Sequence, residues 1–194
     1  IVACISPKGK QNETLVALNE CGVKEIYRVS GAQAIAAMAY GSDTIKPVDL
    51  ICGPGSPWVT AAKILCQEKV AIDMPAGPSE AIMLADDSIV DGVSLPEKAR
   101  YCAADILARA EHGADSAGVL VTTSEKLARL TKSEVEKQIK DRSRKDYIKA
   151  ALKMYSGIFV VDDMDEAVAF TNSYAPEHLE ILTVTPREVL KRIT

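Results

Sequence analysis

The chain has 194 residues, a net charge of −4 and a pI near 5.3, with 47% apolar and 26% charged residues. This length allows one ordinary domain or two small ones, and the composition is that of a globular protein. The acidic balance argues against nucleic-acid binding, because neutralising phosphates requires a basic surface. No apolar run approaches the roughly 18 residues that span a bilayer, so we expect no membrane segment.

The first half of the chain alternates short β-branched runs with helical stretches. We predict strands at 1–4, 25–29, 49–52 and 70–72, and helices at 13–20, 31–40 and 59–67. Gly22 and Gly41 follow two of these helices, as expected at helix C-termini. The segment 75–79, Pro-Ala-Gly-Pro-Ser, is the strongest break in the pattern. We therefore place a boundary there, between lobes 1–79 and 80–194.

The second half continues the same alternation. We predict strands at 81–85, 118–122, 158–161 and 180–184, with helices at 95–111, within 124–155 and at 165–173. A last helix begins after Thr185 as N-cap, with Pro186 as its first residue. Strands that alternate with helices indicate an α/β fold with mainly parallel sheets, here two incomplete Rossmann-like lobes. Because the chain begins in a strand and ends in a helix, we expect it to be part of a longer protein.

The five cysteines are widely spaced and contain no Cys-x-x-Cys pair, which leaves zinc ribbons and dithiol redox motifs unsupported. They lie within apolar runs, where a reduced thiol behaves as a small apolar side chain. Reduced thiols are typical of a cytoplasmic protein. The cysteines are Cys4, Cys21, Cys52, Cys66 and Cys102.

Both histidines of the chain directly follow a glutamate, as Glu111-His112 and Glu177-His178. A carboxylate beside an imidazole places two proton-transfer groups together, although a chance pairing explains the pattern as well. Pro176 predicts that Ala175 is extended. The second pair should then lie on a loop before a strand, where functional side chains are common.

His112 lies three residues after Arg109 at the end of a predicted helix, so the two side chains share a face. A histidine before a glycine at this position often does no more than complement the helix dipole. The more specific alternative is that His112 is a metal ligand. However, one imidazole is not a zinc site, and the sequence contains no His-Glu-x-x-His spacing.

Two loops leave predicted strands and enter helices, at 30–33 and 53–56. Ligands of open parallel sheets collect at the carboxyl ends of strands, and such loops offer free backbone amides. A capping box between Ser30 and Gln33 explains the first loop without a ligand, and an ordinary turn explains the second. Ser79 lies between the lobes, where it either contacts a substrate or completes the turn.

Taken together, five segments resemble the histidinol dehydrogenase family closely and in order along nearly the whole chain. They are Ser-Gly-Ala-Gln-Ala-Ile-Ala-Ala-Met-Ala-Tyr-Gly (30–41), Gly-Pro-Gly-Ser (53–56), Ile-Asp-Met-Pro-Ala-Gly-Pro-Ser-Glu (72–80), Ala-Glu-His (110–112) and Tyr-Ala-Pro-Glu-His-Leu (174–179). The resemblance implies a zinc-dependent, NAD-linked homodimer. Its small-molecule substrate would be L-histidinol, oxidised through L-histidinaldehyde to L-histidine in the last step of histidine biosynthesis.

The resemblance also implies roles for individual residues. His178 would be the general base that takes the hydroxyl proton while contacting the substrate, and Glu177 would activate the water that hydrates the aldehyde. Ser79 matches a substrate contact. Gln33 and Ser56 fall where the family contacts NAD, although an asparagine is usual at the second position.

The zinc site implied by the resemblance is incomplete in this chain. His112 matches a ligand of zinc that also contacts substrate, but Arg109 replaces a glutamine that binds both, and a guanidinium has no lone pair for a metal. The segment around 88–97 contains extra residues, and the two remaining ligands lie beyond the point that corresponds to Thr194. We therefore predict that these 194 residues alone bind neither zinc nor histidinol usefully.

Two alternatives remain open at this stage. A paralogue could act on another alcohol, such as a sulfopropanediol, whose anionic group Arg109 would suit. A catalytically silent domain is the other alternative, and the retention of Glu177 with His178 weighs against it.

Overall fold

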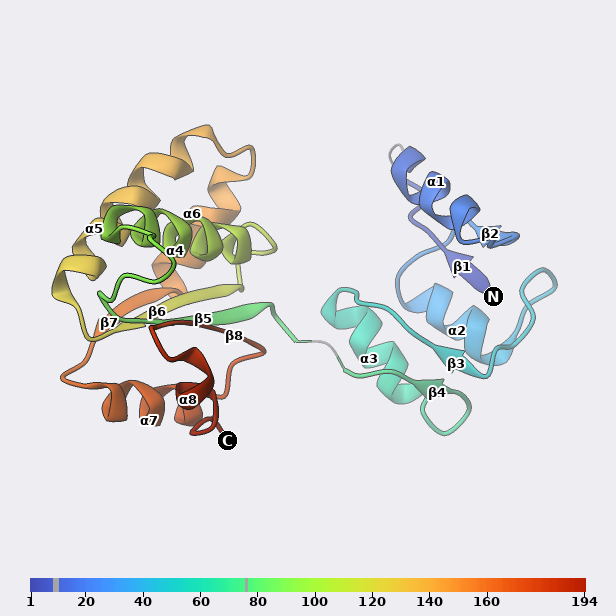
Figure 1. Ribbon diagram of the computed structural model, residues 1–194. Coiled ribbons are helices and arrows are strands. Elements are labelled where there is room, and N and C mark those ends of the chain that lie inside the picture. Colours follow the sequence, from blue (N-terminus) through green and yellow to red (C-terminus); the bar gives the residue numbers. More distant parts are fainter. Residues whose placement is uncertain (9–10, 76) are drawn as a thin grey trace. The chain divides into compact units, whose positions relative to one another are not determined.

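The computed structural model describes residues 1–8, 11–75 and 77–194 (Figure 1). It divides into two compact units, unit 1 at Ile1–Gly77 and unit 2 at Pro78–Thr194. The division falls in the Pro-Ala-Gly-Pro-Ser segment, two residues before the predicted boundary after Ser79.

Within its described residues, unit 1 contains two separate parallel strand pairs and three helices. Strands β1 (Val2–Cys4) and β2 (Glu25–Tyr27) form one pair, and β3 (Leu50–Ile51) and β4 (Ala71–Ile72) form the other. The helices are α1 (Asn12–Glu20), α2 (Ala32–Tyr40) and α3 (Pro57–Leu65). A small core joins α2 and β3 to the end of α3, and it consists of Ile35, Ala39, Ile51, Cys66 and Val70.

Unit 2 is built on one four-stranded parallel sheet with the order β7-β6-β5-β8. The strands are β5 (Glu80–Ala85), β6 (Ala117–Thr122), β7 (Gly157–Val160) and β8 (His178–Leu182). Every residue of β6 is buried, as is all of β5 after Glu80. The central strands are therefore continuous apolar runs, as expected where helices cover both faces of a parallel sheet.

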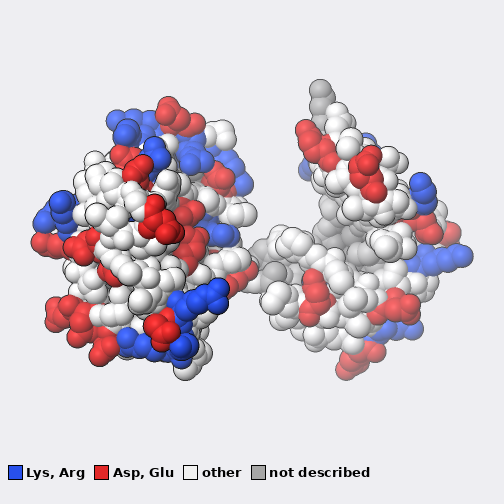
Figure 2. Space-filling view, viewed as in Figure 1, with Lys and Arg blue, Asp and Glu red and all other residues white. Residues whose placement is uncertain are grey.

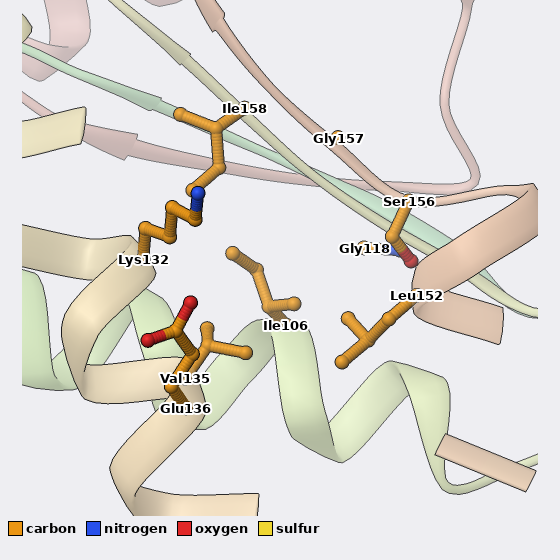
Figure 3. Close-up of a pocket in the computed structure, with 9 residues that line it drawn as sticks. All are labelled: Ile106, Gly118, Lys132, Val135, Glu136, Leu152, Ser156, Gly157 and Ile158. Atoms are coloured by element: carbon orange, nitrogen blue, oxygen red, sulfur yellow. The ribbon is translucent and has the colours of Figure 1, made fainter. Parts of the chain in front are cut away.

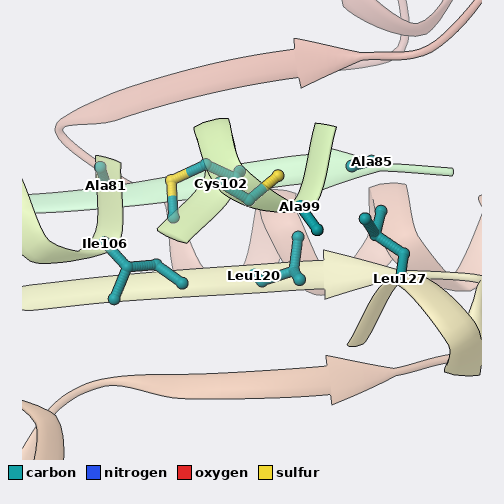
Figure 4. Packing of buried hydrophobic residues seen from close by; sticks show 8 residues of the cluster. Ala81, Ala85, Ala99, Cys102, Ile106, Leu120 and Leu127 are labelled. Atoms are coloured by element: carbon teal, nitrogen blue, oxygen red, sulfur yellow. The ribbon is translucent and has the colours of Figure 1, made fainter. Parts of the chain in front are cut away.

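Helices cover both faces of this sheet (Figure 1). On one face lie α4 (Leu95–Ala110), α5 (Glu125–Gln138), the short 3-10 helix η1 (Ile139–Asp141) and α6 (Lys145–Met154), and on the other lie α7 (Met164–Tyr174) and α8 (Pro186–Leu190). The side chains of β5 alternate between these layers. Figure 4 shows the α4 side, where Ala81 and Ala85 pack with Cys102 and Leu120.

Several helices begin where side chains bond the first free backbone amides. The Ser124 hydroxyl accepts from the Leu127 amide at 3.2 Å at the start of α5. At the start of α7, Asp163 accepts from the Glu166 amide at 2.9 Å. These contacts explain why both helices begin close to their predicted positions.

Three local predictions were wrong. The N-cap of α2 is Gly31 at φ 78°, not Ser30, and no side chain caps the helix, so the capping box with Gln33 does not form. Ala175 is left-handed at φ 51°, not extended, because its amide closes the end of α7 by donating to Thr171 O at 2.9 Å. His178 belongs to β8 and not to a loop, since it is paired in register with Ala81 of β5.

The surface of unit 2 mixes both signs of charge. On the face drawn in Figure 2, lysine and arginine side chains are interspersed with acidic ones. Within the described ranges, none of the helices combines the length and apolar character that crossing a bilayer requires.

Candidate functional site

Five of the residues singled out from the sequence gather at the amino-terminal edge of the unit 2 sheet. Ser79 directly precedes β5, and Glu177 and His178 lie at the start of β8. Arg109 lies in the last turn of α4, and His112 lies in the turn that follows, before β6. Because all four strands are parallel, their amino ends share one edge. This edge lies opposite the carboxyl ends at which ligands of open sheets usually collect.

The Glu177 carboxylate lies between the backbone of β5 and the imidazole of His178. Its Oε2 accepts a hydrogen bond from the Glu80 amide at 3.3 Å, and its Oε1 is 3.7 Å from His178 Nε2. The two side chains are 54% and 46% exposed. The pair is thus fixed at one end by the sheet and remains accessible to a ligand at the other.

Tyr174 adds a further contact at this edge. Its hydroxyl bonds the side chain of Glu80, the residue whose backbone amide holds Glu177. Burial, followed by this hydrogen bond and the negative charge of Glu80, raises the pKa of Tyr174. The end of α7 is therefore connected to the start of β5 beside the Glu177-His178 pair.

Glu180 is a site residue that the sequence analysis missed. It lies two residues after His178 on β8, so both side chains project from the same face, toward α4. Burial, then the charge of Asp105 and a hydrogen bond to it, raises the pKa of Glu180 to about 7, while Arg109 acts in the opposite direction. No local pattern marked Glu180, because the strand was predicted to begin only at residue 180 and Asp105 belongs to α4.

His112 is exposed and lies just beyond the end of α4. Its amide donates to Arg109 O at 3.0 Å, and its carbonyl oxygen accepts from Arg144 at 3.5 Å. Across the described parts of the chain, no three His, Cys, Asp or Glu residues group so as to hold a metal ion. Protein zinc sites need three or four ligands, so these residues by themselves do not fit zinc.

The two residues predicted to contact NAD belong to unit 1, beyond the carboxyl ends of its strands. Gln33 is exposed in the first turn of α2, and Ser56 is the exposed N-cap of α3, with a side chain that caps no amide of the helix. The loop before Ser56 needs its glycines. Gly53 has φ +124°, and a Cβ on Gly55 would lie 2.5 Å from Val59 Cγ1. The loop thus keeps two positions without a side chain and exposes Ser56 at the start of α3.

A separate cavity of about 360 Å³ lies on the α4 face of unit 2 (Figure 3). Its wall is mostly apolar, with Ile106, Leu152 and Ile158 among the lining residues, and Lys132 and Glu136 of α5 also border it. None of the residues predicted from the sequence lines it. The cavity is therefore distinct from the cluster at the amino-terminal edge.

Comparison with known proteins decides the family. The family model described as histidinol dehydrogenase matches residues 1–194. The chain belongs to the histidinol dehydrogenase family. The histidinol dehydrogenase of Methanothermobacter thermautotrophicus is 47% identical over 196 residues, which cover 99% of this chain and 44% of that protein. The histidinol dehydrogenase of Geobacillus kaustophilus is 48% identical over 179 residues, 92% of this chain and 40% of that protein.

Solved structures agree with this assignment. The crystal structure of histidinol dehydrogenase from Elizabethkingia anophelis matches with a TM-score of 0.89 and 41% identity, over 100% of this chain and 44% of that chain. Gamma-glutamyl phosphate reductase from Thermotoga maritima, 13% identical with a TM-score of 0.50, is similar in fold alone. The resemblance and the α/β fold class predicted from the sequence are confirmed. The chain spans less than half the length of these histidinol dehydrogenases.

Proposed function

We propose that the chain is the part of a histidinol dehydrogenase that contains its proton-transfer pair. The full-length protein would oxidise L-histidinol through L-histidinaldehyde to L-histidine. The observation that supports this most directly is the accessible contact between Glu177 and His178, at the edge of a sheet in a chain that the family model matches throughout.

Each side chain of the pair suits one of the two oxidation steps. The His178 imidazole would accept the hydroxyl proton of the alcohol as the aldehyde forms. Glu177, held by the Glu80 amide, would then remove a proton from the water that adds to the aldehyde. NAD, when bound, accepts the hydride in each oxidation.

The residues of unit 1 fit NAD. Gln33 offers an amide and Ser56 a hydroxyl, both exposed at the carboxyl ends of parallel strands. A zinc ion would need ligands besides His112, and the described residues supply no such set. We therefore propose that the 194-residue chain alone does not turn over histidinol.

The positive charge of Arg109 is the feature of the sequence that favours an anionic substrate such as sulfopropanediol. Its charge already acts on Glu180, so its presence does not require an anion in the substrate. Parallel assays of the full-length protein on histidinol and on sulfopropanediol separate these substrates.

The cellular setting is also a proposal. All five cysteines are free, which supports a reducing, cytoplasmic location. The homodimer implied by the family stays a prediction, and light scattering of the full-length protein will test it.

Substitution of the pair tests the proposed chemistry in the full-length protein. We expect His178→Gln to lower kcat by about 10²- to 10⁴-fold, because removal of a general base costs on that order. Glu177→Gln should slow the second oxidation more than the first, so that aldehyde is trapped by semicarbazide in a stopped assay.

Glu111→Gln is the matched control, since Glu111 also precedes a histidine but pairs with Arg142 at 4.0 Å. It should leave kcat within about twofold of wild type. A wild-type protein that forms no NADH with histidinol would rule out the proposed function. Wild-type activity in His178→Gln would rule out the assigned base.

A further inference from the structure

Lys63 is a charged residue in the interior of unit 1. It belongs to α3 and is 2% exposed. Burial of an ammonium group is costly unless its protons are bonded and its charge is paired. Lys63 Nζ meets this requirement through Gly53 O at 3.0 Å, Met74 O at 3.4 Å and a short ion pair with Asp73.

The Lys63–Asp73 pair holds both backbone groups of Gly53. Lys63 bonds its carbonyl oxygen, and Asp73 Oδ2 accepts from its amide at 2.7 Å. The hydrogen bond from the Gly53 amide, followed by the hydrogen bond from Lys63, lowers the pKa of Asp73 to about 2. The carboxylate is therefore ionised, and the pair intact, throughout the neutral pH range.

The pair lies where two adjacent strands end. Gly53 follows β3, and Asp73 follows β4, whose register pairs Ile51 with Ile72. Gly53 also begins the loop 53–56, which ends at Ser56 and the first turn of α3. The hydrogen bonds of Gly53 with Lys63 and with Asp73 thus fix the first residue of the loop that is expected to contact NAD.

We propose that Lys63 and Asp73 are positioning residues for NAD binding, which hold the loop 53–56 in its binding conformation through Gly53. This inference rests on the proposed function. Gly53 has φ +124°, and glycine samples more backbone conformations than any other residue. A loop that is ordered before NAD arrives spares the complex the entropy of ordering it.

The hydrogen bonds and the ion pair of Lys63 and Asp73 described above lie within unit 1, whereas Glu177 and His178 belong to unit 2. Loss of the Lys63–Asp73 pair should therefore weaken NAD binding and leave the chemical step intact, so that KM for NAD rises while kcat at saturating NAD does not change. A pair that only supported the fold of unit 1 would lower thermal stability without this selective effect.

Lys98 provides a matched control in unit 2. It is 3% exposed, and its ammonium donates to the carbonyl oxygens of Asp86 at 3.0 Å, Ser88 at 2.6 Å and Leu182 at 3.0 Å. These acceptors follow β5 or end β8, at the carboxyl edge of the sheet, opposite the Glu177-His178 pair. Lys98→Met thus removes a comparably buried ammonium from unit 2, whereas the loop 53–56 belongs to unit 1.

The experiment compares Lys63→Met, Asp73→Asn and Lys98→Met in the full-length protein, with KM for NAD, KM for histidinol, kcat and Tm measured for each. We expect Lys63→Met and Asp73→Asn to raise KM for NAD at least about tenfold, with kcat and KM for histidinol within about twofold of wild type. Lys98→Met should lower Tm comparably but leave KM for NAD within about twofold.

Three results would overturn the proposal. The first is an unchanged KM for NAD in both unit 1 variants. The second is a rise in KM for NAD in Lys98→Met that equals the rise in the unit 1 variants. The third is failure of both unit 1 variants to fold, whatever the outcome for Lys98→Met. A wild-type protein that does not reduce NAD with histidinol instead contradicts the proposed function itself. The two failures are therefore distinguishable.

Discussion

Glu180 makes the stability of unit 2 depend on pH. Burial and the neighbouring Asp105 raise its pKa from an ordinary value of 4.5 to about 7, so the folded protein holds this proton more tightly than the unfolded chain. The resulting stabilisation is complete below about pH 4.5 and is lost as the pH rises through about 7. Glu180→Gln, which stays neutral, should therefore have a higher Tm than wild type at pH 8, and the difference should shrink toward pH 5.

Thermal unfolding followed by circular dichroism at pH 5, 6, 7 and 8 measures this difference. Glu125→Gln is the control, because Glu125 lies on the surface of α5 in a pair with Arg129 whose side chains are 71% and 70% exposed. Its Tm difference from wild type should not grow with pH in this way. A Glu180→Gln difference that is constant, or that grows toward low pH, contradicts the assignment.

The same residue shows what the sequence could predict of the site. Glu177 and His178 were identifiable because they are adjacent in a specific motif. The effect of Asp105 on the pKa of Glu180 was not identifiable from the sequence, since it depends on how β8 packs against α4. The gathering of Ser79, His112 and the pair at one sheet edge also needed the strand order, which local patterns do not encode.

At the scale of elements, the close approach of α4 to β6 sets a sharp limit on side-chain size at Gly118. A Cβ there would lie 2.8 Å from Ile106 Cα and 2.9 Å from Ile106 O, both backbone atoms that cannot move without the helix. Gly118→Ala should therefore lower the free energy of unfolding by about 1–3 kcal/mol, as overpacking usually does.

Gly157→Ala is a matched control on the neighbouring strand. Its Cβ would lie 2.7 Å from Phe159 Cε2, which is not a backbone atom but the far end of a side chain that is 43% exposed and whose ring centroid lies 4.9 Å from that of Phe170. Urea unfolding of both variants tests the difference. Equal losses of stability would show that α4 adjusts to the added methyl group.

The kind and order of the elements were predictable, because helical and β-branched runs alternate clearly along the chain. Their ends were less predictable where one contact decides them. The amide of Ala175 closes α7 in a left-handed conformation despite the proline that follows. Pairing with Ala81 brings His178 into β8 before its predicted start. In both cases, a backbone hydrogen-bonding pattern overrides the local preference of the sequence.

At the scale of the whole chain, the two units differ in how completely they bury their strands. The sheet of unit 2 has four strands between two helical layers, and β5 and β6 are almost entirely buried. The strands of unit 1 form separate pairs, and two-stranded sheets are marginally stable without further packing. We therefore expect unit 1 to open more readily than unit 2.

Amide hydrogen exchange of the 194-residue chain, read by mass spectrometry, tests this expectation. Local stability follows burial, so the peptides that cover β5 and β6 should exchange last, at a rate set by global unfolding of unit 2. Peptides from β1 to β4 should exchange at least about tenfold faster after correction for intrinsic rates, because an opening that costs 1.4 kcal/mol less is tenfold more populated. The solvated edge strand β7, with Phe159 and Val160 exposed, should fall between them. Equal protection of β4 and β6 would instead mean that both units unfold as a single cooperative body.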